Sequence, residues 1–510
     1  MRVVKMNELG VAFMARTLSS LKMAFTQSCL VLTCIINWSL LCTVYGVIQS
    51  VVIDEQTGKL SIRDGFRPDF VAWANFTDDI EASGWSYLEV TTSGRYEDRT
   101  QAYAAGAVEA VLTSDLLYKH WVNTVIGYCG PFDYDAVYCQ RLKTYIMANL
   151  QWVTEQIERE SDSPYWHQVY LTLLQLRGLE DSYNGQLSIP TGVPTFNPFG
   201  FLLFQMGGDL EDLEAALNKT SQSRTLGSGS CSALVKLLPG NKELFVSHDT
   251  WNNYQSMLRI MKNPATRGQN IVANRLAQSG KEWADLFSKF NSGTYNNQWM
   301  VVDFKHFSPG RSDVTEQLFT VLEQIPGLVV TEDKTKELYE KGYWASYNIP
   351  YYEDIFNASG CPALVDRFGS WFTFDLNPRA QIFRRNQSLV TDLESMVQLM
   401  RYNNFEKDPL SQCEGCNPCH NGENSISARS DLNPANGTYP FGALKQRPHG
   451  GTDMKVTSYA MYKEYQLLAA SGPTWKQVPV FQWSTSPFDD LLHMGHPDRW
   501  AFPTVLVKWP

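Results

Sequence analysis

Two residue types that can do chemistry together occur in the stretch LGSGSCSALVKLLPGNKELFVSHDTW, residues 226–251. Cys231 opens an apolar run after two Gly/Ser pairs, and His248 closes a second apolar run. The turn residues PGNK separate the two runs, a pattern that predicts a β-hairpin. In a tight hairpin, His248 would lie near the start of the strand that Cys231 begins.

A chain cut between Ser230 and Cys231 would carry a thiol and a free α-amine on its new first residue. An α-amine has an ordinary pKa of about 8. It can take the thiol proton, so that one residue supplies both nucleophile and base. The preceding Gly-Ser-Gly-Ser has the backbone freedom that a strained, self-cleaving bond requires. His248 could then orient a substrate or shuttle a proton in an acidic lumen.

The same spacing also fits a structural role for both residues. Free cysteines are among the most buried residue types, so Cys231 can be a core residue and His248 a hydrogen-bonded neighbour. The spacing alone leaves both interpretations open.

The elements that must position these groups come from a chain of 510 residues, enough for one large or two medium domains. Apolar residues make up 44% of it and charged residues 19%, as in soluble globular proteins. The net charge of -10 argues against nucleic acid, and against an anionic membrane surface, as the main partner.

The N-terminus predicts a secretory signal peptide over residues 1–46. Four basic residues precede an uncharged apolar run over residues 29–48, with small residues near Gly46. An uncleaved anchor is the alternative, because the run is nearly long enough to span a bilayer. Asn37 and the hydroxyl residues within the run favour cleavage. No later stretch is apolar enough to cross a membrane, so no stable membrane span is expected.

The sequons and the cysteines are consistent with passage through the secretory pathway. Five N-x-S/T sequons predict a glycoprotein: Asn75, Asn218, Asn357, Asn386 and Asn436. Seven cysteines follow the signal peptide, so at least one is unpaired within the chain. Cys129 and Cys139 flank a turn-rich loop and predict a disulfide. The cluster CEGCNPCHNG at residues 413–422 can close one bridge locally, which leaves Cys231 or Cys361 as the free thiol.

The remaining pattern predicts an α+β fold without regular βαβ alternation. A hairpin is expected over residues 51–65, and helices over 100–121, 136–160 and 163–183. The region up to Lys219 is therefore expected to be mainly helical. Thr250 is expected to N-cap a helix over residues 251–262. Strands are expected at 297–307 and 327–334, a loop at 433–451 and a helix at 456–470.

Several long segments resemble the phospholipase B-like family, from about Val51 to the C-terminus. They include NKTSQSRTLGSGSCSALVKLLPG, SHDTWNNYQSMLRIMK, YWASYNIPYYE and SARSDLNPANGTYPF. The resemblance implies an N-terminal nucleophile hydrolase fold, a four-layer αββα sandwich. It also implies cleavage before Cys231, between an N-terminal fragment 47–230 and a C-terminal fragment 231–510. Delivery to the lysosome lumen through mannose-6-phosphate glycans and their receptor is implied too, with partial secretion.

The resemblance also assigns site residues. Cys231 is the nucleophile, His248 lies nearby, and the amide of Asn348 helps to hold the oxyanion. Arg379 supports the site or contacts a substrate carboxylate. The structural alternatives are a turn residue before Pro350 for Asn348 and a packing role for Arg379.

One departure from the family concerns the segment MKNPATRGQNIVANRLA, residues 261–277. Family members carry several dozen more residues here, including a pair of strands of the central sandwich. Part of the central sheet is therefore expected to be missing from this chain.

No cofactor is expected. The sequence CNPCH fits the C-x-x-C-H pattern of covalent haem, and Cys413, Cys416, Cys419 and His420 could assemble a zinc site. A secretory setting favours a disulfide instead. The family resemblance pairs Cys413 with Cys416.

Two functions follow. The first is a hydrolase that cleaves an acyl ester or amide bond in a lipid or another small molecule. The second is a non-catalytic lysosomal glycoprotein that binds lipid or protein, in which case this chain would be an inactive splice form.

We predict that the mature chain starts near Gly46 and carries N-linked glycans. Endoglycosidase treatment of the protein made in animal cells should increase its gel mobility, because each glycan adds mass. A mobility that stays the same would contradict the secretory route.

Overall fold

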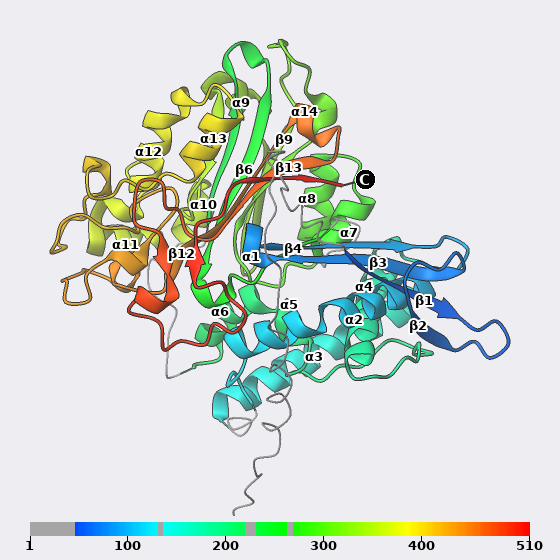
Figure 1. Cartoon of the computed structure of the whole chain (residues 1–510). Helices are drawn as coiled ribbons and strands as arrows, with labels where there is room; N and C mark the ends of the chain where they lie inside the picture. The colour runs from blue at the N-terminus through cyan, green and yellow to red at the C-terminus, as the bar shows by residue number, and fades with distance from the viewer. Residues whose placement is uncertain (1–45, 131–135, 220–230, 263–268, 510) are drawn as a thin grey trace, which may run out of the picture. The chain divides into compact units, whose positions relative to one another are not determined.

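The computed structural model describes residues 46–130, 136–219, 231–262 and 269–509 (Figure 1). Residues 1–45 of the predicted signal peptide, and the Gly/Ser linker with Ser230, lie outside the described residues. Within the described ranges the chain is an α+β protein with several sheets and many helices.

Cys231 begins β5, a strand of a six-stranded sheet with the order β11-β5-β6-β12-β13-β16. All neighbouring strands in this sheet are antiparallel. Its strands are β5 (Cys231–Leu237), β6 (Leu244–Asn253), β11 (Tyr343–Ser346), β12 (His449–Ser458), β13 (Gln466–Ser471) and β16 (Val505–Lys508). The predicted hairpin of Cys231 and His248 is confirmed as the pair β5–β6.

Two smaller sheets form the second layer of strands in the molecule. A five-stranded sheet has the order β2-β1-β3-β4-β7, and a three-stranded sheet has the order β10-β9-β8. The first contains β1 (Val47–Ile53), β2 (Leu60–Asp64), β3 (Phe70–Asp79), β4 (Trp85–Thr92) and β7 (Ile260–Lys262). The second contains β8 (Gln298–Val302), β9 (Phe319–Ile325) and β10 (Leu328–Asp333). A further pair joins β14 (Phe481–Gln482) and β15 (Arg499–Trp500).

Long helices dominate the segment before the linker, and shorter ones follow it (Figure 1). The first group comprises α1 (Ile80–Ser83), α2 (Asp98–Thr124), α3 (Val137–Arg159), α4 (Pro164–Tyr183), α5 (Leu202–Gln205) and α6 (Gly207–Ala216). The second comprises α7 (Gln269–Leu276), α8 (Gly280–Ser288), α9 (Thr335–Lys341), α10 (Glu353–Ala358), α11 (Cys361–Phe368), α12 (Pro378–Asn386), α13 (Leu393–Met400) and α14 (Tyr459–Tyr462).

The six-stranded sheet buries both of its faces. Side chains alternate along a strand, so Leu234 and Val235 of β5 point to opposite sides. Leu234 joins a core with Phe383 of α12 and with residues of α13. Val235 joins a second core with Phe319 and other residues of β9. This sheet therefore lies between helices on one face and a second sheet on the other.

Helices cover the outer faces of the two smaller sheets. The five-stranded sheet packs on α2 through a core that includes Val71 and Tyr103. The three-stranded sheet packs on α8 through Leu322 and Trp283. Trp85 of β4 contributes to a core with residues of β13 and β16, which connects the five-stranded sheet to the six-stranded one.

Most of the predicted elements are confirmed. The hairpin over 51–65 is β1–β2, the three long helices are α2, α3 and α4, and the two later strands are β8 and β10. Helix outweighs strand up to Lys219, as predicted, but residues 70–92 form the unpredicted strand pair β3–β4. Its apolar residues are needed to cover the inner face of α2.

Two predicted helices are wrong. Thr250 does not N-cap a helix, because β6 continues to Asn253 between β5 and β12. The segment 456–470 is not helical either: β12 and β13 pair through it, and only the single turn α14 reverses the chain. In both places pairing within the six-stranded sheet outweighs the helical spacing of the apolar residues.

Both predicted disulfides are present, Cys129–Cys139 and Cys413–Cys416. Among the described residues Cys231, Cys361 and Cys419 are free thiols. No helix in the described part of the chain is both long and apolar enough to cross a bilayer.

Two glycines set the distance between α2, the helix that backs the five-stranded sheet, and α4, which packs on α2. A Cβ on Gly106 would lie 1.9 Å from the carbonyl oxygen of Gln175, and one on Gly178 would lie 2.0 Å from that of Tyr103. These contacts are with backbone, which no side-chain rotation can relieve. The two helix backbones therefore pack directly against each other.

We predict that Gly106→Ala and Gly178→Ala each lower the free energy of unfolding by about 1–3 kcal/mol, because the helices must separate. The matched control is Gly207→Ala in α6, where an added Cβ meets nothing within 4 Å. Thermal unfolding of the three variants measures the difference. Equal unfolding temperatures would contradict the tight helix packing.

Candidate active site

Cys231 occupies the first position of β5, at the end of the six-stranded sheet. It lies opposite Thr250 of β6, which in turn lies opposite Asp453 of β12. Two residues along the strands, Ala233, His248 and Lys455 form the next row on the same face. Residues opposite one another share a face of a sheet, so the nucleophile candidate and His248 lie on the same face.

Arg379 holds the start of β5 from the neighbouring helix. It is the second residue of α12, and its backbone N–H donates to the side chain of the N-cap residue Asn377 at 3.0 Å. Its guanidinium donates to the carbonyl oxygen of Cys231 at 2.6 Å and to that of Tyr347 at 2.6 Å. It also donates to Oδ1 of Asn348 at 3.0 Å. One side chain thus connects α12, the start of β5 and the segment after β11.

The guanidinium of Arg379 is a buried cation, with the residue only 3% exposed. Its centre lies 4.3 Å from the ring centroid of Trp251, in a cation–π contact. No carboxylate in the described ranges lies within ion-pair distance of it. Burial lowers the pKa of Arg379 to about 10, so the group stays charged at neutral pH. Glu423 attracts this cation from beyond ion-pair distance. A buried cation without a direct ion pair is suited to stabilise negative charge that forms at Cys231.

Asn348 lies beside Cys231 in a strained backbone conformation. Its φ of 65° is in the left-handed region, which asparagine tolerates better than most residues. Oδ1 accepts from the backbone N–H of Cys231 at 3.4 Å as well as from Arg379. Arginine can only donate, so this contact fixes which end of the amide faces Cys231. The residue is exposed, which leaves it accessible to a substrate.

The thiol of Cys231 is protonated in the uncut chain. The residue keeps partial exposure, but protein atoms crowd its sulfur, and this burial raises the pKa of Cys231 to about 12. The backbone N–H of Trp251 opposes the rise, while Asp453 and Asp249 add to it. A proton acceptor is therefore required before this sulfur can act as a nucleophile.

His248 is neutral over most of the physiological range. Burial lowers the pKa of His248 to about 4, Lys455 lowers it further, and Asp453 opposes the shift. The predicted role of His248 in orienting a substrate or shuttling a proton stays a prediction, and the lowered pKa leaves the resting ring neutral above about pH 4. The resting ring can accept a proton there and can afterwards pass that proton on.

The structure brings together the four residues named from the sequence, three of them by direct hydrogen bonds. It adds Trp251, which packs on Arg379, together with Thr250 and Asp453. In the sequence Thr250 and Asp453 lie in the stretches SHDTW and TDMKV, whose mixed polar and apolar residues give no distinct signal for a shared site.

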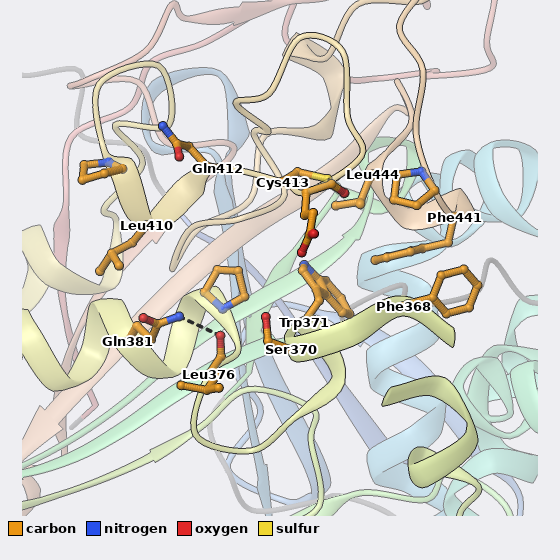
Figure 2. Close-up of a pocket in the computed structure, with 14 residues that line it drawn as sticks. Phe368, Ser370, Trp371, Leu376, Gln381, Leu410, Gln412, Cys413, Phe441 and Leu444 are labelled. Carbon is orange, nitrogen blue, oxygen red and sulfur yellow. Dashed lines mark hydrogen bonds between the residues drawn. The ribbon is translucent and has the colours of Figure 1, made fainter. Parts of the chain in front are cut away.

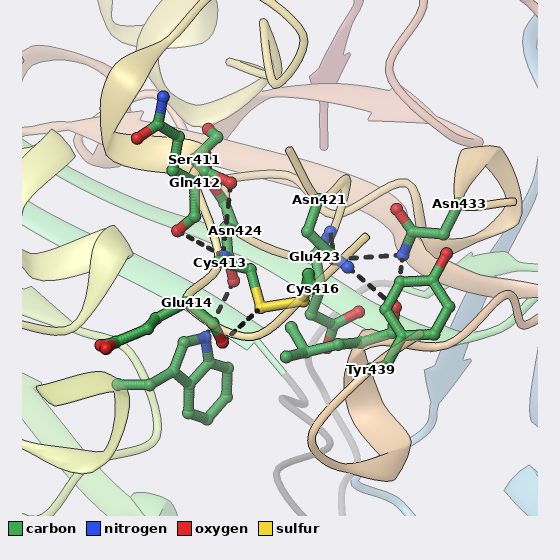
Figure 3. The surroundings of a disulfide bond; sticks show 12 residues. Ser411, Gln412, Cys413, Glu414, Cys416, Asn421, Glu423, Asn424, Asn433 and Tyr439 are labelled. Carbon is green, nitrogen blue, oxygen red and sulfur yellow. Dashed lines mark hydrogen bonds between the residues drawn. A yellow bond between two sulfur atoms is a disulfide. The ribbon is translucent and has the colours of Figure 1, made fainter. Parts of the chain in front are cut away.

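The other chemical candidates lie elsewhere. Cys413 and Cys416 are joined in a disulfide among buried asparagines (Figure 3), so two of the four proposed zinc or haem ligands are oxidised. The described residues contain no cluster of three potential metal ligands. Of the sequons, Asn218, Asn357 and Asn436 are exposed, and Asn75 and Asn386 are half-buried.

A cleft of about 230 Å³ lies beside this disulfide (Figure 2). Its lining includes Phe368, Trp371, Leu376 and Phe441. None of the four predicted site residues lines it, although Pro378 connects it to Arg379 along the chain.

A profile of the phospholipase B family matches residues 72–270 and 265–507. The chain belongs to the phospholipase B family. Human phospholipase B-like 2 is 56% identical to this chain over an alignment 527 positions long, gaps included, which covers 90% of each protein. The mouse protein of that name is 54% identical and covers 90% of this chain and 89% of its own. A Caenorhabditis elegans phospholipase B-like 1 is 39% identical over 503 residues, covering 86% of this chain and 87% of its own.

The family match falls into two pieces that meet at residues 265–270. This is the segment where the resemblance predicts missing residues. It joins β7, the last strand of the five-stranded sheet, to α7.

We predict that Cys231 in the uncut chain reacts at least about 100-fold more slowly with iodoacetamide at pH 8 than Cys419, because only the thiolate is alkylated. Cys419 is an exposed free thiol in the same molecule and serves as the internal control. Mass spectrometry of the peptide with an intact Ser230–Cys231 bond measures the labelling. Equal rates would show that the sulfur is neither crowded nor protonated.

Proposed function

We propose that this protein is a lysosomal N-terminal-cysteine hydrolase that cleaves an acyl ester or amide bond. One observation carries the proposal: the backbone N–H and C=O of Cys231, the first residue of β5, are held by Asn348 and Arg379. Both partners are side chains from a segment and a helix far along the chain, which fix the position of this one residue. They suit a residue whose amine and sulfur both react.

The order of the layers supports an N-terminal nucleophile hydrolase fold. Four layers pack in the following order: helices α12 and α13, the six-stranded sheet, the two smaller sheets, and helices α2 and α8. In such a fold the nucleophile is the first residue of a central strand, as Cys231 is of β5.

Maturation would begin with attack of the Cys231 sulfur on the carbonyl carbon of Ser230. A thioester forms, the Ser230–Cys231 amide bond breaks, and the nitrogen of Cys231 gains a proton to become an amine. Water then hydrolyses the thioester, which leaves a carboxylate on Ser230 and a free thiol and amine on Cys231.

The mature residue would act on a substrate in the same way. Its α-amine takes the thiol proton, and the sulfur attacks the acyl carbon. The oxyanion is stabilised by the amide of Asn348 and by the positive charge of Arg379. The ammonium returns its proton to the leaving alcohol or amine, and water releases the acid. The family name favours a phospholipid or another lipid as the substrate, with no cofactor.

Lysosomal delivery through mannose-6-phosphate glycans and their receptor completes the proposal. The exposed sequons Asn218, Asn357 and Asn436 are the candidates to carry these glycans.

The broken family match favours a second candidate, a non-catalytic glycoprotein that binds lipid or protein. The second layer of the core consists of two separate sheets, and the family match divides between them. A chain that folds but never cleaves itself would belong to this class.

N-terminal sequencing and an electrophilic thiol probe distinguish the two candidates. We predict that the purified protein contains a fragment that begins at Cys231 and that the probe labels this fragment. Cys231→Ala should abolish both cleavage and hydrolysis. Cys231→Ser should cleave slowly and hydrolyse little, because a hydroxyl is harder to ionise than a thiol.

Two results would decide against the enzyme. A Cys231→Ala chain that still yields a fragment beginning at residue 231, with proteases absent, would remove Cys231 as the nucleophile of cleavage. An uncut and unlabelled wild-type chain would favour the binding protein.

A further inference from the structure

The row that contains Cys231 continues into a hydrogen-bonded chain of polar groups. Oγ1 of Thr250 lies 3.2 Å from Nδ1 of His248 and 3.0 Å from Oδ1 of Asp453. A hydroxyl group has one hydrogen to donate, so these two contacts cannot both be donations by Thr250. The charge state of Asp453 decides between them.

Asp453 is a charged carboxylate that can only accept. The residue is fully buried, and its carboxylate pairs with Lys455 and with Arg259, whose Nε lies 3.6 Å from Oδ2. Burial by itself would raise the pKa of Asp453, but the two cations outweigh it and lower the pKa to about 2. Thr250 therefore donates its single hydrogen to Asp453.

His248 must then donate to Thr250. The hydroxyl oxygen, with its hydrogen directed at Asp453, offers only lone pairs to the ring. Nδ1 of His248 consequently carries the ring hydrogen, and Nε2 of the neutral ring carries a lone pair. The charged groups on this face are Asp453, Lys455 and Arg259, which act on His248, and Cys231 lies diagonally across the strand pair.

We propose that Thr250 and Asp453 are positioning residues that keep the ring proton of His248 on Nδ1, so that Nε2 accepts the thiol proton of Cys231 in the uncut chain. This inference rests on the proposed self-cleavage. It supplies what that step lacks, because the nitrogen of Cys231 is still an amide before the cut and cannot act as a base. His248 then returns the proton to the nitrogen that leaves as the amide bond breaks.

The distance across the strands permits this role. Diagonal neighbours on an antiparallel pair have Cα atoms about 7–8 Å apart, within reach of a histidine side chain. His248 and Cys231 are such diagonal neighbours, with Thr250 directly opposite Cys231. Transfer can be direct or through one water molecule.

The first test compares Thr250→Val with Thr250→Ser. Valine keeps the shape and the β-branching but removes the hydroxyl, whereas serine keeps the hydroxyl. We expect Thr250→Val to slow the appearance of the fragment beginning at Cys231 by at least about tenfold. Thr250→Ser should restore cleavage to within about threefold of wild type, a rescue that a packing role would not give. A Thr250→Val chain that cleaves at the wild-type rate would overturn the proposal.

The pH profile gives a second readout. Because His248 is neutral above about pH 4, cleavage by wild type should lose rate only as the pH falls towards 4. An acid limb near pH 6.5, the ordinary value for histidine, would contradict a buried, oriented base.

The third test does not depend on hydrolysis or on the folding of a Thr250 variant. Nitrogen NMR of the ¹⁵N-histidine-labelled Cys231→Ala full chain, with His248→Gln in the same background to assign the signal, reports which ring nitrogen is protonated. We expect the proton on Nδ1 at pH 7, and a proton on Nε2 would overturn the inference. A wild-type chain that never cleaves would refute the proposed function, while this measurement would still decide the tautomer.

Discussion

The candidate site depends on one buried cation. Arg379 is almost fully enclosed, yet its hydrogen bonds go to neutral acceptors: the carbonyl oxygens of Cys231 and Tyr347 and the amide oxygen of Asn348. Burial of a charge without a direct ion pair is costly, and the hydrogen bonds to these acceptors offset part of that cost. Here the cation fixes the start of β5, orients the amide beside it and places positive potential where an oxyanion would form.

Two buried acids, Asp249 and Asp453, lie on opposite faces of the six-stranded sheet and have different roles. Asp249 and Thr250 are adjacent on β6 and point to opposite faces. Burial raises the pKa of Asp249 well above its usual value, and Oδ2 of this acid accepts from the indole N–H of Trp251 at 2.9 Å. Asp453, on the face of Cys231, is ionised because Lys455 and Arg259 pair with it. The helix-covered face therefore packs Trp251 under Arg379, and the opposite face holds the charge that orients His248.

The sequence predicted what depends on local pattern and missed what depends on pairing partners far along the chain. Cys231, His248 and the hairpin around PGNK follow from alternation and turn residues alone, and the family resemblance added Asn348 and Arg379. Thr250 and Asp453 are about two hundred residues apart and meet only because β12 pairs with β6. The apolar spacing in residues 251–262 and 456–470 fits a helix as well as a strand, and only the neighbouring strands decide.

The division of the second layer of strands into two sheets affects the stability of the fold more than it affects the candidate site. β7 and β8 are the end strands of their sheets in the described ranges, and the family match breaks between them. An end strand leaves one row of backbone groups without a strand partner, which weakens a sheet and invites pairing with other chains. The site, however, is built on β5, β6 and β12 and on α12. β6 pairs with β5 on one side and with β12 on the other, with one register shift between Gly451 and Asp453, and Arg379 of α12 bonds the start of β5. The contacts around Cys231 therefore do not depend on how the second layer of strands is divided.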